Sequence, residues 1–482
     1  MNSPPIFKFE NSYAGLPERF CQRIDPTPVA APSLIRLNED LARALGLDPA
    51  AIATPEGVSI LAGNRVAPTS VPIAMAYAGH QFGNFVPQLG DGRAILLGEL
   101  GGRDLHLKGA GQTRFSRRGD GRAALGPVLR EYIISEAMAA LGIPTTRTLA
   151  AVATGETVMR ETPLPGAVLA RVAASHIRVG TFEYFGARRD TEGLRILADY
   201  AIARHYPHCR DAANPYRAFF DSVIAAQAEL IAKWLLVGFI HGVMNTDNMT
   251  ISGETIDFGP CAFMDFYNPK QVYSSIDRMG RYAYGNQPTM AHWNLVCLAE
   301  TLVPLLAETE EAGLREAEDA MSAFAPRFEA AYLAGLTRKA GLGSSDEDIA
   351  LVQSLLGLMA ADGADFTLTF RRLADAVRHP GQEAEVRTLF KTPAALDGWL
   401  ETWRTRLTPA AASTMRAVNP AFIPRNHLVE EALTAATALG DFGPFERLIE
   451  VITRPFDDQP GREVYSLPPR PEQVVHATFC GT

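Results

Sequence analysis

The chain has 482 residues, of which 47% are hydrophobic and 21% charged, and its formal net charge is −9. This is the composition of a globular protein long enough for two or three lobes with real cores. The negative charge argues against a nucleic-acid partner, and five scattered cysteines without a Cys-x-x-Cys pair indicate neither a zinc site nor a secreted disulfide framework.

The first residues are not expected to be a secretory signal. They lack a charged stretch followed by an apolar core, and the most apolar predicted helix, 225–240, is interrupted by Glu229 and Lys233 and is too short to span a bilayer. We therefore expect a cytoplasmic protein without a membrane partner. Residues 1–60 are expected to form an N-terminal extension with one amphipathic helix from Ser33 to Leu45, capped by Ser33.

A glycine-containing loop and a β-hairpin are predicted between residues 78 and 109. Strands at 94–100 and 104–108 flank a turn at Gly101-Gly102, and Lys108 ends the second strand. In kinases such a loop brings backbone N–H groups to phosphates and the Lys adds a point charge. The glycine spacing does not match Gly-x-Gly-x-x-Gly, and a lone Lys on a strand is usually solvated.

The next segment, 109–122, contains four arginines, which indicates either an anion-binding loop or a mobile solvated one. A helix is predicted to begin near Pro127 and to end at Leu141. It carries Glu131 in its first turns, as the αC helix of a kinase does, so Glu131 would pair with Lys108. The alternative is a surface Glu on an amphipathic helix.

Three strands are predicted next, at 149–153, 157–160 and 167–173. Arg171 and Arg178 lie in or after apolar runs, where a charge needs a carboxylate or a phosphate as partner. Helices are predicted afterwards at 192–205, 214–238, 287–306, 311–340 and 345–362, with more as far as 452.

The polar loop 241–259 contains the residues that point most directly to chemistry. Two short strands, 249–251 and 255–258, are predicted to form a tight hairpin around Ser252-Gly253. The hairpin would bring Asn248 close to Asp257, and an amide oxygen with a carboxylate can share Mg²⁺.

The same loop contains Asp257-Phe258-Gly259, the triplet that holds the metal over ATP in kinases, with Asn248 at the matching distance. Val243 stands where kinases carry the catalytic Asp, and a carboxylate reappears at Asp247. The alternative is a surface hairpin that is rich in Asn and Asp because turns favour them.

These features together predict an α+β, protein-kinase-like fold with two lobes. The expected parts are a β-rich N-lobe with an αC-type helix at 61–190, a large α-helical C-lobe at 191–454 that includes the catalytic loop 241–259, and a tail at 455–482.

Several motifs resemble the selenoprotein O family, whose bacterial members are also called YdiU. They are Gly-His-Gln-Phe-Gly (79–83), Gln-Leu-Gly-Asp-Gly-Arg (88–93), Leu-His-Leu-Lys-Gly-Ala-Gly (105–111), Ser-Arg-x-Gly-Asp-Gly-Arg-Ala (116–123), Ala-Arg-Val-Ala-x-Ser-His-Ile-Arg-x-Gly (170–180) and His-Gly-Val-Met-Asn-Thr-Asp-Asn-Met (241–249). Arg130-Glu131, Ser-Glu-Ala-Met (135–138) and Arg425-Asn426 also fit, so the resemblance covers most of the chain.

The resemblance implies a pseudokinase that transfers AMP from ATP to Ser, Thr or Tyr hydroxyls of proteins and releases pyrophosphate. It leaves open whether UTP also serves. Carried over by motif, Asp247 would be the general base, Asn248 and Asp257 would hold Mg²⁺ or Mn²⁺, and Glu131 would pair with Lys108. The implied ATP contacts are Gly90, Gly92, Arg93, Lys108, Asp120, Gly121, Arg171, Arg178 and Asp257.

Two departures from the family pattern stand out. The family's Thr-Pro-Tyr-Ser-Arg is here Thr-Arg-Phe-Ser-Arg (113–117), which changes loop stiffness and none of the implied contacts. Cys480 matches the tail cysteine of many members. Ser274-Ser275 stand where a partner cysteine would be expected and Cys261 lies nearer the triplet, so the sequence does not predict a regulatory disulfide.

Three functions compete at this point. The chain could be a protein adenylyltransferase, a phosphotransferase acting on a protein or a small molecule, or an inactive nucleotide-binding scaffold. Val243 disfavours the phosphotransferase, and the presence of Lys108, Glu131, Asn248 and Asp257 disfavours the scaffold.

Overall fold

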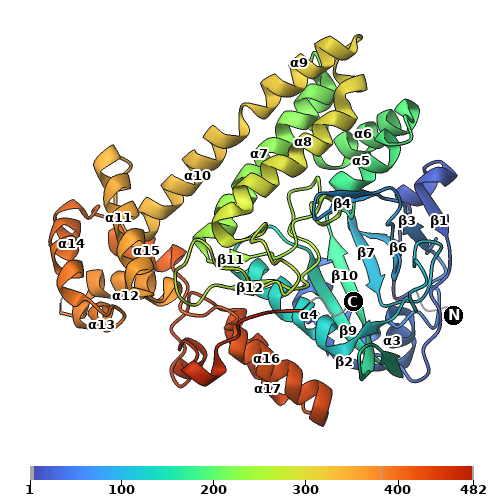
Figure 1. Cartoon of the computed structure of the whole chain (residues 1–482). Coiled ribbons are helices and arrows are strands. Elements are labelled where there is room, and N and C mark those ends of the chain that lie inside the picture. The colour runs from blue at the N-terminus through green and yellow to red at the C-terminus, as the bar shows by residue number, and fades with distance from the viewer. Residues whose placement is uncertain (1–4, 380, 480–482) are drawn as a thin grey trace.

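An eight-stranded antiparallel sheet, two small two-stranded sheets and a large helical region make up the computed structural model, which describes residues 5–379 and 381–479 (Figure 1). The strand order is β1-β3-β6-β7-β10-β9-β2, with β8 beside β10. The strands are β1 (Cys21–Arg23), β2 (Ser33–Leu37), β3 (Ile73–Met75), β6 (Ala94–Leu100), β7 (Arg103–Lys108), β8 (Ala123–Ala124), β9 (Arg147–Met159) and β10 (Pro163–Ala173). The mixed α/β architecture agrees with the predicted class, and β1 and β2 bring residues of 1–60 into the sheet.

The sheet is buried on both faces, which explains the apolar composition of its strands. Ile95 and Leu97 of β6 pack into one hydrophobic cluster with the short helices α1 (Glu39–Ala44), α2 (Pro49–Ile52) and α3 (Pro55–Leu61). Leu96 points to the other face, toward the cluster that includes α4 (Leu125–Ala140). Alternate side chains therefore serve two cores.

The strand predictions hold in the centre of the sheet and fail at its start. The predicted hairpin of β6 and β7 is present, with positive φ at both turn glycines, and the strands expected at 149–153 and 157–160 are one strand, β9. The helix expected from Ser33 to Leu45 is present only as α1, Glu39–Ala44, and the predicted cap at Ser33 is wrong. Residues 33–37 pair with β9, and Asn38 caps the helix that follows by accepting from Leu41 N.

The helices that follow the sheet in the sequence largely match the prediction, although the first of them, at 179–186, was not predicted. They are α5 (Val179–Gly186), α6 (Thr191–His205), α7 (Pro215–Leu236), α8 (Gln287–Leu306), α9 (Glu310–Met321), α10 (Phe324–Lys339), α11 (Asp346–Asp362), α12 (Phe366–Arg378), α13 (Glu383–Arg387), α14 (Pro393–Arg406), α15 (Ala411–Val418), α16 (Asn426–Thr434) and α17 (Gly443–Ile452). The single helix expected at 311–340 is broken between α9 and α10. Pro326 accounts for the break, because its ring would clash with the carbonyl of Ser322 in a continuous helix.

Figure 1 shows how the helices are arranged around the sheet. Helices α7, α8 and α9 lie together, α10 leads away to the group α11–α15, and α16 and α17 return to lie against α4. Tyr132 of α4 meets Phe445 of α17 edge to face at 5.5 Å, which fixes that return. Across residues 5–379 and 381–479, no helix combines the length and the apolar character needed to cross a membrane.

Candidate active site

The loop 241–259 lies between two short paired strands. β11 (Phe239–Ile240) pairs with β12 (Ala262–Phe263), and buried His241 lies 2.8 Å through Nε2 from the carbonyl of Ile256, which joins the start of the loop to its end. Asp257 has a φ of +60°, a left-handed conformation uncommon for a residue other than glycine. Such backbone strain often marks a functional site.

The hairpin predicted at 249–258 is wrong. Thr250 pairs with Arg178 and Thr255 with Thr145, so the two segments bridge to other parts of the chain instead of to each other. The Thr250 hydroxyl donates to the carbonyl of Glu254 at 2.6 Å and accepts from its N–H at 3.1 Å, closing the turn through a side chain. Asn248 and Asp257 nevertheless lie on the wall of the same cavity.

That cavity has a volume of about 380 Å³ and lies between the sheet and the loop. It collects most of the residues that the sequence selects as site candidates. They are Gly92, Arg93, Lys108, Arg171, Arg178, Asp247, Asn248 and Asp257.

Asp257 is the centre of a cluster of positive charges. Its carboxylate lies 3.0 Å from Lys108 Nζ, 2.6 Å from Arg171 Nη1 and 2.5 Å from Arg178 Nη1. Burial alone would raise the pKa of Asp257, but the charges of Lys108, Arg178 and Arg171 hold it well below its usual range. Five Lys and Arg side chains line the cavity against the three carboxylates of Asp91, Asp247 and Asp257. The wall therefore carries an excess of positive charge, which suits a polyphosphate.

The ion pair expected between Lys108 and Glu131 is present. Lys108 Nζ lies 2.5 Å from Glu131 Oε2, and Arg171 Nη1 lies 3.2 Å from Glu131 Oε1. Glu131 is 3% exposed, below the cavity wall, so it holds the two cations in place without facing the cavity itself.

Asp247 faces the cavity with one oxygen engaged. Its Oδ2 accepts from Gln81 at 3.2 Å, whereas its buried Oδ1 has no hydrogen-bond partner among the residues that the structure describes. Burial raises the pKa of Asp247 to about 6, against the opposing charge of Arg178. Arg178 holds the loop through the main chain, by donating to the Asp247 carbonyl at 2.5 Å. A carboxylate with a free buried oxygen is well suited to accept a proton.

Gly90, Asp120 and Gly121 do not line the cavity. Gly90 has a φ of +69°, and a Cβ there would lie 2.3 Å from the ring of Phe115, so the residue shapes the loop. A Cβ on Gly121 would lie 2.1 Å from the backbone of Gly111. Asp120 is exposed and pairs with Arg160 at 2.8 Å.

The sequence reasoning missed several residues of the site. Asp91 lies between two selected glycines and is buried, with Oδ2 at 3.1 Å from His106 Nε2; His106 Nδ1 in turn lies 3.0 Å from Arg171 Nη2. Through these two contacts, Asp91 and His106 orient the Arg171 guanidinium. Tyr77 places its ring 4.7 Å from the Arg178 guanidinium, and no motif pointed to it.

The donor set of the cavity fits a hard divalent cation. Asn248 Nδ2 donates to the carbonyl of Val243 at 2.9 Å, which leaves its Oδ1 as an acceptor, and Asp257 supplies a carboxylate. Oxygen donors of this kind suit Mg²⁺ or Mn²⁺. Val243 contributes no ionisable group to the wall.

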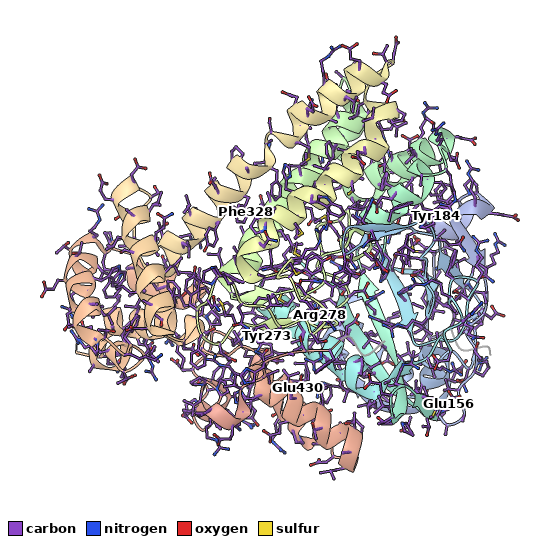
Figure 2. The ribbon with its side chains drawn as sticks, in the orientation of Figure 1. Glu156, Tyr184, Tyr273, Arg278, Phe328 and Glu430 are labelled. Carbon is purple, nitrogen blue, oxygen red and sulfur yellow. The ribbon has the colours of Figure 1, made fainter. Side chains whose placement is uncertain are left out.

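The C-terminal tail also touches this region. The Thr478 hydroxyl donates to the carbonyl of Pro260 at 2.6 Å, and its N–H donates to the carbonyl of Tyr273, labelled in Figure 2, at 2.7 Å. Ser275 N donates back to the Thr478 carbonyl at 3.0 Å. Cys480, the tail cysteine of the sequence prediction, lies outside the described residues.

Comparison with known proteins agrees with this geometry. Residues 6–453 match the sequence model of a family described as protein adenylyltransferase SelO. Proteins named protein nucleotidyltransferase YdiU are 61% identical in a strain of Bradyrhizobium and in a strain of Methylorubrum extorquens, and 60% identical in a strain of Rhodopseudomonas palustris. Each alignment covers 99% of this chain and 99% of the relative.

The cavity and the matches together define an enzyme of the nucleotidyltransferase class. More particularly, the chain belongs to the SelO family, as the motif resemblance predicted.

Proposed function

We propose that this protein transfers AMP from ATP to Ser, Thr or Tyr hydroxyls of other proteins and releases pyrophosphate, with Mg²⁺ or Mn²⁺ bound at Asn248 and Asp257. UTP is a second nucleotide to test. The observation that carries the proposal is the hydrogen bonding of the three carboxylates that line the cavity, Asp91, Asp247 and Asp257. Among the described residues, Asp247 alone of these keeps a buried oxygen without a hydrogen bond.

We further propose a two-lobed, kinase-like division of the chain. The N-lobe is 61–190, to which the extension 1–60 adds β1 and β2. The helical C-lobe is 191–454, and the tail is 455–482. The sheet with Lys108, the helix with Glu131 and the Asp-Phe-Gly loop support this division, because a kinase assembles its nucleotide site from the same three parts.

The proposed reaction is a nucleophilic displacement at the α-phosphorus of ATP. Asp247 accepts the proton of the attacking hydroxyl, the hydroxyl oxygen forms a bond to the α-phosphorus of ATP, and the bond from that phosphorus to the bridging oxygen breaks. Pyrophosphate leaves with the electron pair. Lys108, Arg171 and Arg178 face the cavity with the charge that the departing pyrophosphate needs.

A cation bound in the cavity would neutralise phosphate charge and support displacement at phosphorus. Asn248 and Asp257 would hold it. The Asp257 carboxylate already contacts the side chains of Lys108, Arg171 and Arg178. These contacts must therefore rearrange when the nucleotide enters.

ATP labelled at different phosphates tests the proposal. The purified protein is incubated with a mixture of acceptor proteins and Mg²⁺ or Mn²⁺, once with α-³²P-ATP and once with γ-³²P-ATP. We expect label on protein from the α position only, and mass spectrometry should find AMP on Ser, Thr or Tyr. Label from γ only would establish a kinase instead, and label from neither with bound ATP would favour a scaffold.

Gly90, Gly92, Arg93, Asp120 and Gly121 are proposed ATP contacts from the motif match. Gly92 and Arg93 line the cavity, whereas the other three act on the loops around it. Cytoplasmic location and the absence of membrane and nucleic-acid partners remain part of the proposal.

A further inference from the structure

A second and larger cavity, of about 880 Å³, has residues of α5 and α8 in its wall. Its lining shares no residue with that of the first cavity. Three of its lining side chains are common metal ligands: His80 on β4 (Gly79–Gln81), Glu183 on α5 and Cys297 on α8. Tyr184, labelled in Figure 2, is the neighbour of Glu183 and marks the place.

The three side chains converge from separate elements. Their ligand atoms all lie within 4.8 Å of one another, and His80 Nδ1 is 2.5 Å from Glu183 Oε1. Glu183 and Cys297 are buried, at 4% and 6% exposure, while the imidazole is partly open to the cavity.

The imidazole is also held in orientation. Its ring lies 5.2 Å from that of Trp293, edge to face, and 5.0 Å from that of Phe85. Trp293 and Cys297 are four residues apart on α8, so they share the helix face that meets His80. Ligands supported in this way bind metal with less loss of side-chain freedom.

We propose that His80, Glu183 and Cys297 form a binding site for a thiophilic divalent cation of the Zn²⁺ type, distinct from the Mg²⁺ or Mn²⁺ position at Asn248 and Asp257. Imidazole nitrogen, carboxylate oxygen and thiolate sulfur are each donors that zinc accepts, and the cavity leaves a fourth position for water. The thiolate selects against Mg²⁺.

The geometry needs only small adjustments. In a tetrahedral zinc site, bonds of about 2.0–2.3 Å place the ligand atoms roughly 3.3–3.7 Å apart. The atoms here already lie within 4.8 Å of one another, a difference that side-chain torsions cover. The Cys297 thiol gives its proton to solvent on binding, and the His80–Glu183 hydrogen bond opens.

No short cysteine motif predicts this site, because residues 80, 183 and 297 come from three distant segments. His80 lies in the motif Gly-His-Gln-Phe-Gly (79–83), which the nucleotide cavity explains only in part. Gln81 and Phe82 line that cavity, and His80 lines the other.

The site is connected to the proposed base through one residue. Thr246 donates to Glu183 through its hydroxyl, and that hydroxyl accepts from His80 N at 2.7 Å. Thr246 precedes Asp247, so a metal that draws Glu183 away would loosen the loop that carries Asp247. This effect on AMP transfer rests on the proposed function; metal binding does not.

Cobalt spectroscopy tests the binding without ATP. Chelator-treated, full-length protein is titrated with Co²⁺ and then with Zn²⁺, in millimolar Mg²⁺. We expect one equivalent of Co²⁺ to give a thiolate-to-cobalt charge-transfer band with tetrahedral visible bands, and Zn²⁺ to abolish both. Zn²⁺ affinity is measured by competition with a chromophoric chelator.

Three variants assign the ligands. Cys297→Ser should lose the charge-transfer band and weaken Zn²⁺ binding at least about tenfold, whereas His80→Gln should weaken binding but keep the band. Cys21→Ser is the matched control, because Cys21 is also 6% exposed and should leave the spectrum unchanged.

The proposal is overturned if wild-type protein gives no thiolate band with Co²⁺, or if Cys297→Ser binds Zn²⁺ as tightly as wild type. Should Cys297→Ser fail to fold, a wild-type band with unchanged affinity in His80→Gln overturns it equally. Zn²⁺ binding with unaltered AMP transfer would remove only the link through Thr246.

Discussion

Replacing Asp247 with Asn separates a proton-accepting role from a structural one. The amide keeps the shape of the side chain and its acceptor toward Gln81, which donates to Oδ2 at 3.2 Å, but it cannot take a proton from a hydroxyl. The Arg178 bond to this loop goes to the main-chain carbonyl of Asp247, so it survives the substitution. Loop geometry should therefore stay the same while basicity is lost.

The expected size of the effect follows from these contacts. Loss of a general base lowers kcat by about 10²–10⁴-fold, or roughly 2.7–5.4 kcal/mol at about 1.36 kcal/mol per decade. ATP affinity should change by less than about threefold, because Asn248 and Asp257 are untouched. The free energy of unfolding should not fall by more than about 1 kcal/mol, since Oδ1 has no hydrogen bond to lose.

The assay is AMP transfer from α-³²P-ATP at saturating ATP, with Mg²⁺-dependent ATP binding measured by calorimetry on the same preparation. Asp346→Asn is a matched control, an exposed carboxylate at the start of α11 that undergoes the same chemical change. If Asp247 only caps the loop, Asn caps nearly as well and activity stays near wild type. That result would remove Asp247 from the mechanism.

Three further changes probe the charged network and one buried cation. Asp257→Ala should abolish divalent-dependent ATP binding and lower the free energy of unfolding by about 3–5 kcal/mol, because buried Arg178 loses the one carboxylate that it pairs with among the described residues. Full activity at ordinary Mg²⁺ would contradict the metal assignment. Lys108→Ala should weaken ATP binding with little change in the Tm measured without ATP, because Glu131 keeps its ion pair with Arg171 at 3.2 Å. A large loss of stability with normal ATP affinity would mean that the Lys108–Glu131 pair is merely structural. Lys339 is buried against two phenylalanine rings, and burial lowers its pKa to about 7. Between pH 7 and 10.5 the unfolded chain therefore binds more protons than the folded protein, so the free energy of unfolding rises with pH across that window. Lys339→Met should be more stable than wild type by about 4 kcal/mol near pH 7, and the gap in urea unfolding should close toward pH 10.5; a gap independent of pH would refute a neutralised Lys339.

The parts of the site that could be predicted are those written in contiguous or ordered segments. Asp247, Asn248 and Asp257 lie within one loop, and a strand that ends in Lys108 followed by a helix with Glu131 has few ways to fold other than side by side. The pairing of β2 with β9 could not be seen, because the partner lies more than a hundred residues away and the local pattern also suits a helix.

The missed features share this dependence on distant partners. The Asp91–His106–Arg171 chain links three segments through side chains, and no spacing in the sequence encodes it. The hairpin expected at 249–258 does not form, because the Thr250 hydroxyl closes the turn by donating to the carbonyl of Glu254. The backbone of Thr250 pairs with Arg178 instead.

The contact between Thr478 and Pro260 has a consequence for synthesis of the protein. The two residues are 218 positions apart, and Pro260 directly follows the Asp-Phe-Gly triplet. At about 5–20 residues per second, a ribosome needs roughly 10–40 s to reach Thr478 after it has made Pro260. During that interval the residues of the large sheet and of α7 have already been synthesised, but the carbonyl of Pro260 lacks the hydrogen bond from Thr478. The part of the cavity wall at Pro260 therefore gains this contact only when translation is almost finished.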